Sequence, residues 1–124
     1  ETVLYNMKYG TNASDETVVA FIKENNLGAV FASISDGIYA HAGVNGNNLS
    51  GGMQKITMLV RGILKAQQEG AVLILDEPTV GLDENTVQSV LYMLNEKELL
   101  HMKLLLITHD ARVLEMSRLL SYEL

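Results

Sequence analysis

Two short apolar runs, separated by a helical pattern, constrain the fold of this chain more than any other feature of its sequence. The runs occupy residues 71–75 and 104–107, and between them apolar side chains recur at helical spacing over residues 87–94. Continuous apolar runs of this length are typical of parallel strands buried between other layers. The pattern therefore predicts a buried strand, a helix capped by Asp83 or Asn85, and a second buried strand parallel to the first.

The residues before this unit predict helices. Residues 1–10 are mixed in character. A helix opens at the polar cap residues 12–15, and a second short helical piece is predicted at 27–34. Gly and Asn then dominate residues 43–52, which indicates a loop.

A strong amphipathic helix follows that loop. Apolar residues recur at i, i+3, i+4, i+7 and i+8 over residues 56–64, and the helix is expected to start at 50–52. Helices followed by a strand–helix–strand unit indicate a helical subdomain, residues 1–66, joined to part of an α/β sheet, residues 67–124. A last apolar stretch at 119–124 completes the sheet portion.

The composition excludes several classes of protein and partner. The net charge of −6 argues against nucleic acid or an anionic membrane surface as partner, because both favour clustered Lys and Arg. The absence of cysteine excludes disulfides and Cys-ligated metal centres. The apolar runs are far shorter than the roughly 20 residues of a membrane-spanning helix. The chain opens without Met or a leader, so we expect a soluble fragment of a longer protein.

Asp76 and Glu77 close the first apolar run. At the carboxyl end of a parallel strand, where α/β sheets bind ligands, one carboxylate can hold Mg²⁺ and the next can polarise an attacking water. A solvated strand end is the competing interpretation, and a lone acidic pair would support the two equally.

Ser50, Gly51 and Gly52 open the amphipathic helix, so unpaired backbone N–H groups and the positive end of the helix dipole face outward there. Two glycines permit an anion to approach closely, and Ser50 can add a hydroxyl donor. The simpler alternative is a serine N-cap after a glycine turn, and for this segment alone that alternative is the stronger.

His109 follows the second apolar run at the same end of the predicted sheet, where an imidazole can contact a γ-phosphate or position a water. A lone histidine at a strand end more often makes only hydrogen bonds. His41 and His101 lack such a setting and are expected at the surface. The six methionines are expected to fill gaps in the core or at interfaces.

Three segments taken together, LSGGMQ, VLILDEPTVGLD and LLLITHD, resemble the second half of the nucleotide-binding domain of an ABC-type ATPase. Residues 49–54 match the signature LSGGQ, with Met53 where the family usually has Gln. Residues 72–77 match Walker B, residues 80–83 match the D-loop, and His109 matches the switch histidine. The order and approximate spacing of all four motifs agree, and the resemblance covers essentially the whole chain.

The resemblance implies an α/β fold, a partial P-loop NTPase (RecA-like) parallel sheet with an ABC-type helical subdomain. It implies ATP and Mg²⁺ as cofactors, with Asp76 on the metal and with Glu77 and His109 as catalytic residues. In the family two such domains pair head to tail, so Ser50 would close on a nucleotide held by the partner. The nucleotide-binding residues implied by the signature and the D-loop are Leu49, Ser50, Gly51, Gly52, Met53 and Asp83.

The sequence also departs from the family pattern. It contains no G-x-x-x-x-G-K-[ST] motif, the Walker A cradle, and the Q-loop glutamine lies upstream of the corresponding segment in the family. We therefore expect an ATPase in the complete parent and an inactive chain in isolation.

Residues 2–10 are similar to the segment after the Q-loop of exporters, and AGVNGNNLSGG resembles the exporter X-loop, with Val44 in place of the usual acid. The segment EPTVGLD is closer to the corresponding segment of importers than to that of exporters. The resemblance favours an exporter-like transporter that moves a substrate across a membrane. It implies transmembrane domains and a second ATPase domain as partners, and a position at the cytoplasmic face of the membrane.

Two other interpretations stay open. One is a truncated, non-catalytic module that lends its signature helix to an intact ATPase subunit. The other is part of a soluble ABC ATPase of translation or DNA repair, against which the acidic charge and the exporter-like residues 2–10 both count.

Overall fold

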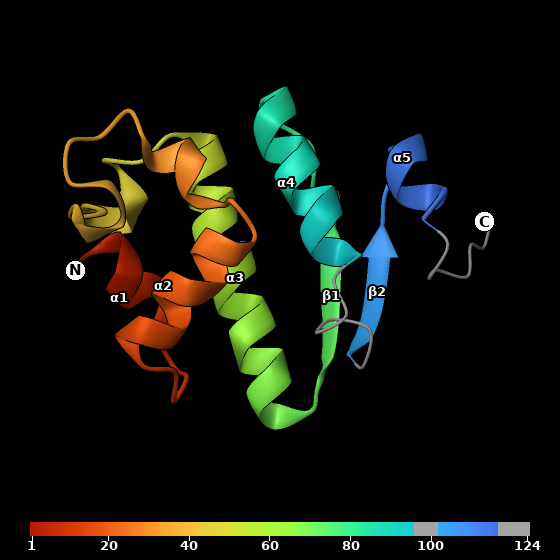
Figure 1. The fold of residues 1–124 in the computed structure, drawn as a ribbon, viewed down its shortest axis with the longest axis horizontal. Coiled ribbons are helices and arrows are strands. Elements are labelled where there is room, and N and C mark those ends of the chain that lie inside the picture. Colours follow the sequence, from red (N-terminus) through yellow and green to blue (C-terminus); the bar gives the residue numbers. More distant parts are fainter. Residues whose placement is uncertain (96–101, 117–124) are drawn as a thin grey trace.

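The computed structural model describes residues 1–95 and 102–116, and it places a group of helices beside a two-stranded parallel sheet (Figure 1). The elements are, in chain order, α1 (Val3–Lys8), α2 (Asp15–Glu24), the 3-10 turns η1 (Gly28–Phe31), η2 (Gly37–Tyr39) and η3 (Val44–Gly46), α3 (Gly51–Glu69), β1 (Val72–Asp76), α4 (Glu84–Leu94), β2 (Lys103–Ile107) and α5 (Ala111–Leu114). The predicted order, helices followed by strand, helix and strand, is confirmed. The apolar stretch predicted at 119–124 and His101 lie outside the described residues.

Helix α3 lies between the N-terminal helices and the sheet (Figure 1). It begins after Ser50, whose Oγ accepts the backbone N–H of Met53 at 3.2 Å, and it ends at Glu69, before the capping residue Gly70, which adopts a left-handed φ of 63°. The predicted amphipathic helix and its start are confirmed. The buried side chains of α3 are Met53, Ile56, Thr57, Leu59, Val60, Ile63, Leu64 and Ala66.

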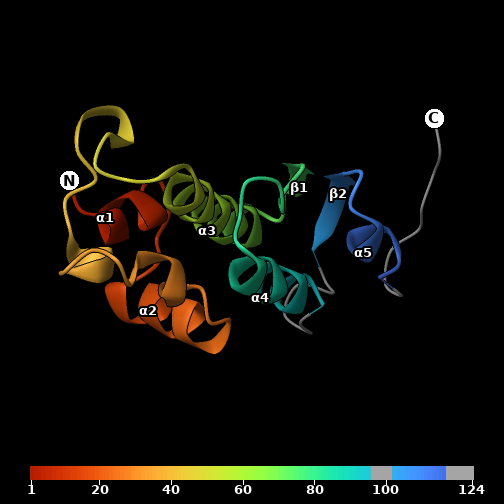
Figure 2. The same ribbon diagram turned by 90° about the horizontal axis from the view of Figure 1, so that it is seen from above.

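Helix α1 packs on the side of α3 that faces away from the sheet, and α2 packs against α1 (Figure 2). Helix α2 starts where the sequence predicts, because the Oγ of Ser14 accepts the backbone N–H of Thr17 at 3.1 Å. The helical piece predicted at 27–34 is the 3-10 turn η1. Helix α1 was not predicted, since residues 1–10 show no clear period.

The N-terminal residues pair with the loop that leads to α3. Thr2 and His41 form an isolated antiparallel bridge, and the backbone N–H of Val3 donates to the carbonyl of Ala40 at 2.9 Å. These bonds hold together the two segments that resemble parts of an exporter, residues 2–10 and the loop before the signature.

Strands β1 and β2 pair in parallel, with Ile74 opposite Leu105 and Asp76 opposite Ile107. The prediction that both strands are buried is wrong. Ile74 exposes 60% of its surface and Leu105 exposes 51%, whereas Leu73, on the other face, exposes 8%. Helix α4 lies on one side of the two strands, and no described helix lies over the other side (Figure 2). One face of the sheet is therefore apolar and exposed within the described residues.

Helix α4 begins after Asp83, which accepts the backbone N–H of Thr86 at 2.8 Å, so Asp83 rather than Asn85 is the cap. One hydrophobic core then joins the helices, and its members include Met7 of α1, Ile63 of α3 and Val113 of α5.

The predicted division between residues 66 and 67 falls in the last turn of α3 and stays a prediction. Met7, Met53, Met93 and Met116 are buried as expected, whereas Met58 exposes 54% of its surface. None of the described helices combines the length and the apolar composition needed to cross a membrane.

Candidate functional site

The carboxyl ends of β1 and β2 bring together the acidic pair and the histidine segment. The backbone N–H of Glu77 donates to the carbonyl of Ile107 at 2.6 Å, which extends the parallel pairing by one bond. In return, the backbone N–H of His109 donates to Oε1 of Glu77 at 3.0 Å, and the hydroxyl of Thr108 donates to Oε2 at 3.3 Å. Both oxygens of the Glu77 carboxylate are therefore anchored by the segment that follows β2.

The backbone of Glu77 is in the left-handed region, with φ of 50°. A non-glycine residue adopts this region at a cost, and the surrounding bonds must hold it there. Its carbonyl accepts the backbone N–H of Val80 at 3.3 Å, which closes a turn at the start of the predicted D-loop. This turn reverses the chain and directs the Glu77 side chain toward the neighbouring strand end.

The His109 imidazole is fully exposed, and its Nε2 lies 3.8 Å from Oε1 of Glu77. The backbone of His109 thus makes the close contact with Glu77, and the ring is left facing solvent, where it is accessible to a ligand. The predicted proximity of the two residues is present in the structure.

Asp76 ends β1 with an exposed side chain. Within residues 1–95 and 102–116, no group of three or more acidic or histidine side chains could hold a metal ion. Mg²⁺, however, is commonly bound through one or two carboxylates, with water and substrate phosphates as its other ligands. A single exposed aspartate next to Glu77 fits that mode of binding.

The predicted signature residues divide into an exposed set and a buried set. Ser50 and Gly51 are exposed, and a Cβ added at Gly51 would meet only open space. Leu49 and Met53 are buried at 9% and 6% exposure, so their side chains anchor the start of α3 in the core. A Cβ at Gly52 would lie 3.6 Å from the side chain of Leu82, which places the start of α3 beside the predicted D-loop.

Asp83 is the N-cap of α4, so the structure gives it a structural task in addition to the predicted binding one. The backbone N–H and the hydroxyl of Thr86 both donate to its carboxylate, and they lower the pKa of Asp83 below its usual value. Its predicted contact with nucleotide is a separate matter and stays a prediction.

Sequence reasoning missed a third carboxylate at the same edge, Asp110. Its Oδ2 accepts the hydroxyl of the buried Thr79 at 2.8 Å and lies 3.0 Å from a guanidinium nitrogen of Arg112. The hydrogen bonds from Arg112 and then from Thr79 lower the pKa of Asp110 to about 2. Arg112 also contacts Glu84 in the first turn of α4 at 2.9 Å, so it joins the two strand ends to that helix.

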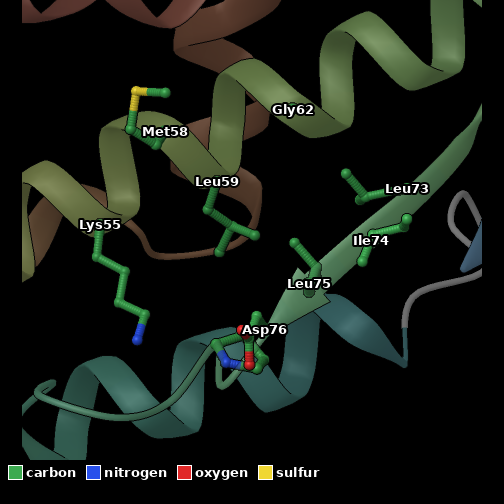
Figure 3. Close-up of a pocket in the computed structure, with 9 residues that line it drawn as sticks. Lys55, Met58, Leu59, Gly62, Leu73, Ile74, Leu75 and Asp76 are labelled. Atoms are coloured by element: carbon green, nitrogen blue, oxygen red, sulfur yellow. The ribbon is translucent and has the colours of Figure 1, made fainter. Parts of the chain in front are cut away.

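Lys55 was missed as well, because a lysine inside an amphipathic helix is usually a solvated residue. Its Nζ donates to the carbonyls of Glu77 and Val80, the latter at 2.8 Å. A hollow of about 260 Å³ opens between α3 and β1 next to this contact, with Lys55 and Asp76 at one end (Figure 3). Its other lining residues are Met58, Leu59, Gly62, Leu73, Ile74, Leu75 and Pro78.

The predicted site residues therefore form two groups. Asp76, Glu77 and His109 meet at the strand ends, and Ser50, Gly51 and Gly52 lie at the start of α3. Among the described residues no hydrogen bond joins Ser50 to Asp76 or Glu77, whereas Lys55, on the helix that Ser50 caps, donates to the backbone carbonyl of Glu77.

No protein-family model matches the chain. The ATP-dependent lipid A-core flippase of Francisella novicida is 36% identical over 77% of this chain, and ABC transporter B family member 13 of Arabidopsis thaliana is 34% identical over 72% of it. The chain spans only 16% and 7% of the lengths of these relatives. Among solved structures, a bacterial Atm1-family ABC exporter with ATP bound matches 90% of this chain and 19% of its own, with 28% identity and a TM-score of 0.71.

The matches define the class of the protein as a transporter-related ABC component. More closely, the chain is a homologue of ABC exporters, the subclass that the resemblance of residues 2–10 and of the segment AGVNGNNLSGG favoured. Its mixture of helices with a parallel strand pair matches a segment of the exporter structure.

Proposed function

We propose that residues 1–124 are the signature-bearing, C-terminal half of an ABC ATPase domain that powers transport across a membrane. The observation that carries this proposal is the placement of Glu77, whose two carboxylate oxygens are anchored at the carboxyl end of two parallel strands. A carboxylate fixed in direction beside an exposed acid suits the activation of a water next to a metal-bound phosphate. The homology to ABC exporters supports the same assignment.

In the complete domain, Glu77 polarises the water that attacks the γ-phosphate, and His109 contacts that phosphate through its exposed ring. Asp76 holds Mg²⁺, and its exposed carboxylate at the strand end fits this cation. When bound, the cation would neutralise charge on the phosphates of the ATP substrate. These three residues would act on nucleotide bound in the same domain.

Ser50, Gly51 and Gly52 close on a nucleotide held by a second domain in a head-to-tail dimer. The Oγ of Ser50 accepts one bond from its own helix, and a serine hydroxyl still carries a proton that it can donate to a phosphate. The open space at Gly51 leaves room for that phosphate. Leu49 and Met53 support this contact from the core, and Asp83 joins the two sites from the D-loop.

The remainder of the proposal concerns the larger assembly. The two described strands belong to a RecA-like parallel sheet, and residues 1–66 form the helical subdomain. Transmembrane domains carry the substrate, and the ATPase works at the cytoplasmic face of the membrane. Exporters among the relatives support this arrangement.

A second candidate is a non-catalytic module that only lends its helix terminus to an intact subunit. The exposure of Ser50 and Gly51 supports it as well. It differs from the first proposal in requiring no hydrolysis at Glu77.

Substitutions in the full-length parent, or in a fusion behind the P-loop half of a similar domain, test the proposal. Glu77→Gln keeps size but removes charge, so ATP binding should persist while turnover falls by at least about 100-fold. The ATP-bound dimer should then accumulate. Ser50→Arg should block closure, leaving ATP bound to monomers.

Hydrolysis rate and dimer mass are measured for both variants, with Glu69→Gln, an exposed acid at the far end of α3, as the control. If Glu77→Gln hydrolyses ATP at the parent's rate, Glu77 is a solvated acid at a strand end and its catalytic assignment is wrong. If the parent itself forms ATP-dependent dimers without turnover at this site, the second candidate replaces the first.

A further inference from the structure

We propose that Lys55 is a positioning residue that holds the Glu77 carboxylate in its working direction and couples it to the signature end of α3. This inference rests on the proposed function, since it assigns Lys55 a part in the same site. The Lys55 side chain forms a tether between α3 and the turn that follows β1.

The geometry of the tether is simple. Lys55 lies on α3, and its side chain reaches across to the end of β1, where Asp76 is located (Figure 3). Its Nζ donates to the carbonyl of Glu77 and to the carbonyl of Val80, which are the first and last residues of one turn. A lysine ammonium has three donors and no acceptor, so a single side chain can bind both carbonyls at once.

Glu77 needs such a tether because its backbone is held in the left-handed region at φ of 50°. Residues other than glycine keep this conformation only when their surroundings hold it. On the amino side, the Glu77 N–H is bound to Ile107, and on the carbonyl side the bonds come from Lys55 and from the N–H of Val80. Loss of Lys55 would leave the carbonyl side with the single 3.3 Å bond from Val80.

The direction of the carboxylate follows from that backbone. Its contacts with the N–H of His109 and the hydroxyl of Thr108 measure 3.0 and 3.3 Å, and both require the turn to stay where it is. A rotation of the turn would move the carboxylate away from both donors. Lys55 therefore acts on catalysis through Glu77 and not through contact with substrate.

The same tether links the two groups of site residues. Ser50 caps α3, and Lys55 lies in the next turn of the same helix. Because a helix moves as a rigid body over so short a distance, a displacement of the Ser50 end pulls on the Glu77 turn. When the signature residues close on a partner's nucleotide, the movement of α3 would then shift the Glu77 turn of the same chain.

Lys55→Met in the full-length parent removes the donors and keeps most of the length of the side chain. We expect kcat for ATP hydrolysis to fall by about 10-fold or more while KM for ATP changes little, because misplacing a catalytic group costs rate and not binding. Amide exchange at His109, followed by mass spectrometry of the peptides that cover it, should become about 10-fold faster as its bond to Glu77 opens more often. Lys55→Arg keeps the donors and should restore most of both quantities.

Lys65→Met is the matched control. Lys65 lies on α3 and also donates to a carbonyl, that of Gly10, at 3.3 Å, but it is remote from Glu77. It should change neither kcat nor exchange at His109. A Lys55→Met protein with the parent's kcat and the parent's exchange would overturn the positioning role, and so would an equal loss in Lys65→Met.

An inactive parent would instead overturn the proposed function. Amide exchange at His109 could still be measured in such a parent. If Lys55→Met did not change the rate of that exchange, the tether would not hold Glu77.

Discussion

Two carboxylates near the carboxyl end of the sheet, Glu77 and Asp110, differ in what surrounds them. Glu77 accepts one backbone N–H and one hydroxyl, and 26% of its side chain is exposed. Asp110 accepts a buried hydroxyl and pairs with Arg112, and only 14% of its side chain is exposed. The donors to Glu77 are neutral, so its carboxylate stays available for chemistry. The carboxylate of Asp110 is paired with the Arg112 cation, and its role is structural.

The pKa of Asp110, lowered to about 2 from a usual value of 3.8, predicts an acid-dependent contribution to stability. A carboxyl with a depressed folded-state pKa stabilises the fold above its unfolded-state value, and the contribution is lost as the pH falls toward the folded-state value. Unfolding midpoints in urea should therefore decline between about pH 4 and pH 2. Asp110→Asn should start lower at pH 7 and decline less over that range.

Asp36→Asn, at an exposed aspartate in the turn before η2, is the control and should keep the parent's pH profile. A profile for Asp110→Asn that parallels the parent's would contradict the assignment to Asp110.

At the scale of residues, the two apolar runs could place Asp76, Glu77 and His109 at one edge of the sheet, because each lies within two residues of the end of a run. Their roles stay predictions. The sequence could not identify Thr79, Asp110 and Arg112 as one network. Their bonds join segments 31 and 28 residues apart, through Thr79 to Asp110 and Arg112 to Glu84. Only the parallel pairing of β1 with β2 brings these segments together.

At the scale of elements, helix ends were predicted better than burial. Ser50 and Asp83 cap α3 and α4 because a short polar side chain before an apolar period satisfies free N–H groups, which is a local property. The burial of β1 and β2 depends on which other elements cover them. The apolar runs therefore predicted the two strands correctly, but the prediction that both strands are buried was wrong. Helix α1 escaped prediction because six residues are too few to show a period.

The start and end of α3 offer a test in which stability and function should separate. Gly51→Ala places a methyl group in open space at a helical position without positive φ, so unfolding free energy should rise by about 0.5–1 kcal/mol. If Gly51 makes room for a partner's phosphate, the same change should reduce ATP-dependent dimer formation.

Gly70→Ala is the opposite case, since φ of 63° is left-handed, and it should lower unfolding free energy by about 1–2 kcal/mol. Denaturant unfolding and dimer mass in the presence of ATP give both quantities. An alanine at position 51 that stabilises the protein and leaves dimerisation intact would remove the phosphate role of Gly51.

At the scale of the whole molecule, the described residues have a hydrophobic core on one side of the sheet and an exposed apolar surface on the other. Val72, Ile74, Leu105 and Ile107 each expose at least 50% of their surface. Their strands pair only with each other among the described residues, so each also has a free edge. Exposed apolar strands with free edges favour association between chains.

We therefore expect residues 1–124, expressed alone, to associate with a second copy through this sheet. Sedimentation velocity should show a mass that rises with concentration. Ile74→Lys places a charge at the centre of the exposed face, where burial against another copy would require desolvating it, so the variant should stay monomeric at concentrations where the parent associates. Val44→Lys removes a side chain that is 76% exposed but lies in η3, outside the sheet, and it should associate like the parent. If the parent is monomeric at all concentrations, or if both variants behave alike, the sheet face does not drive association.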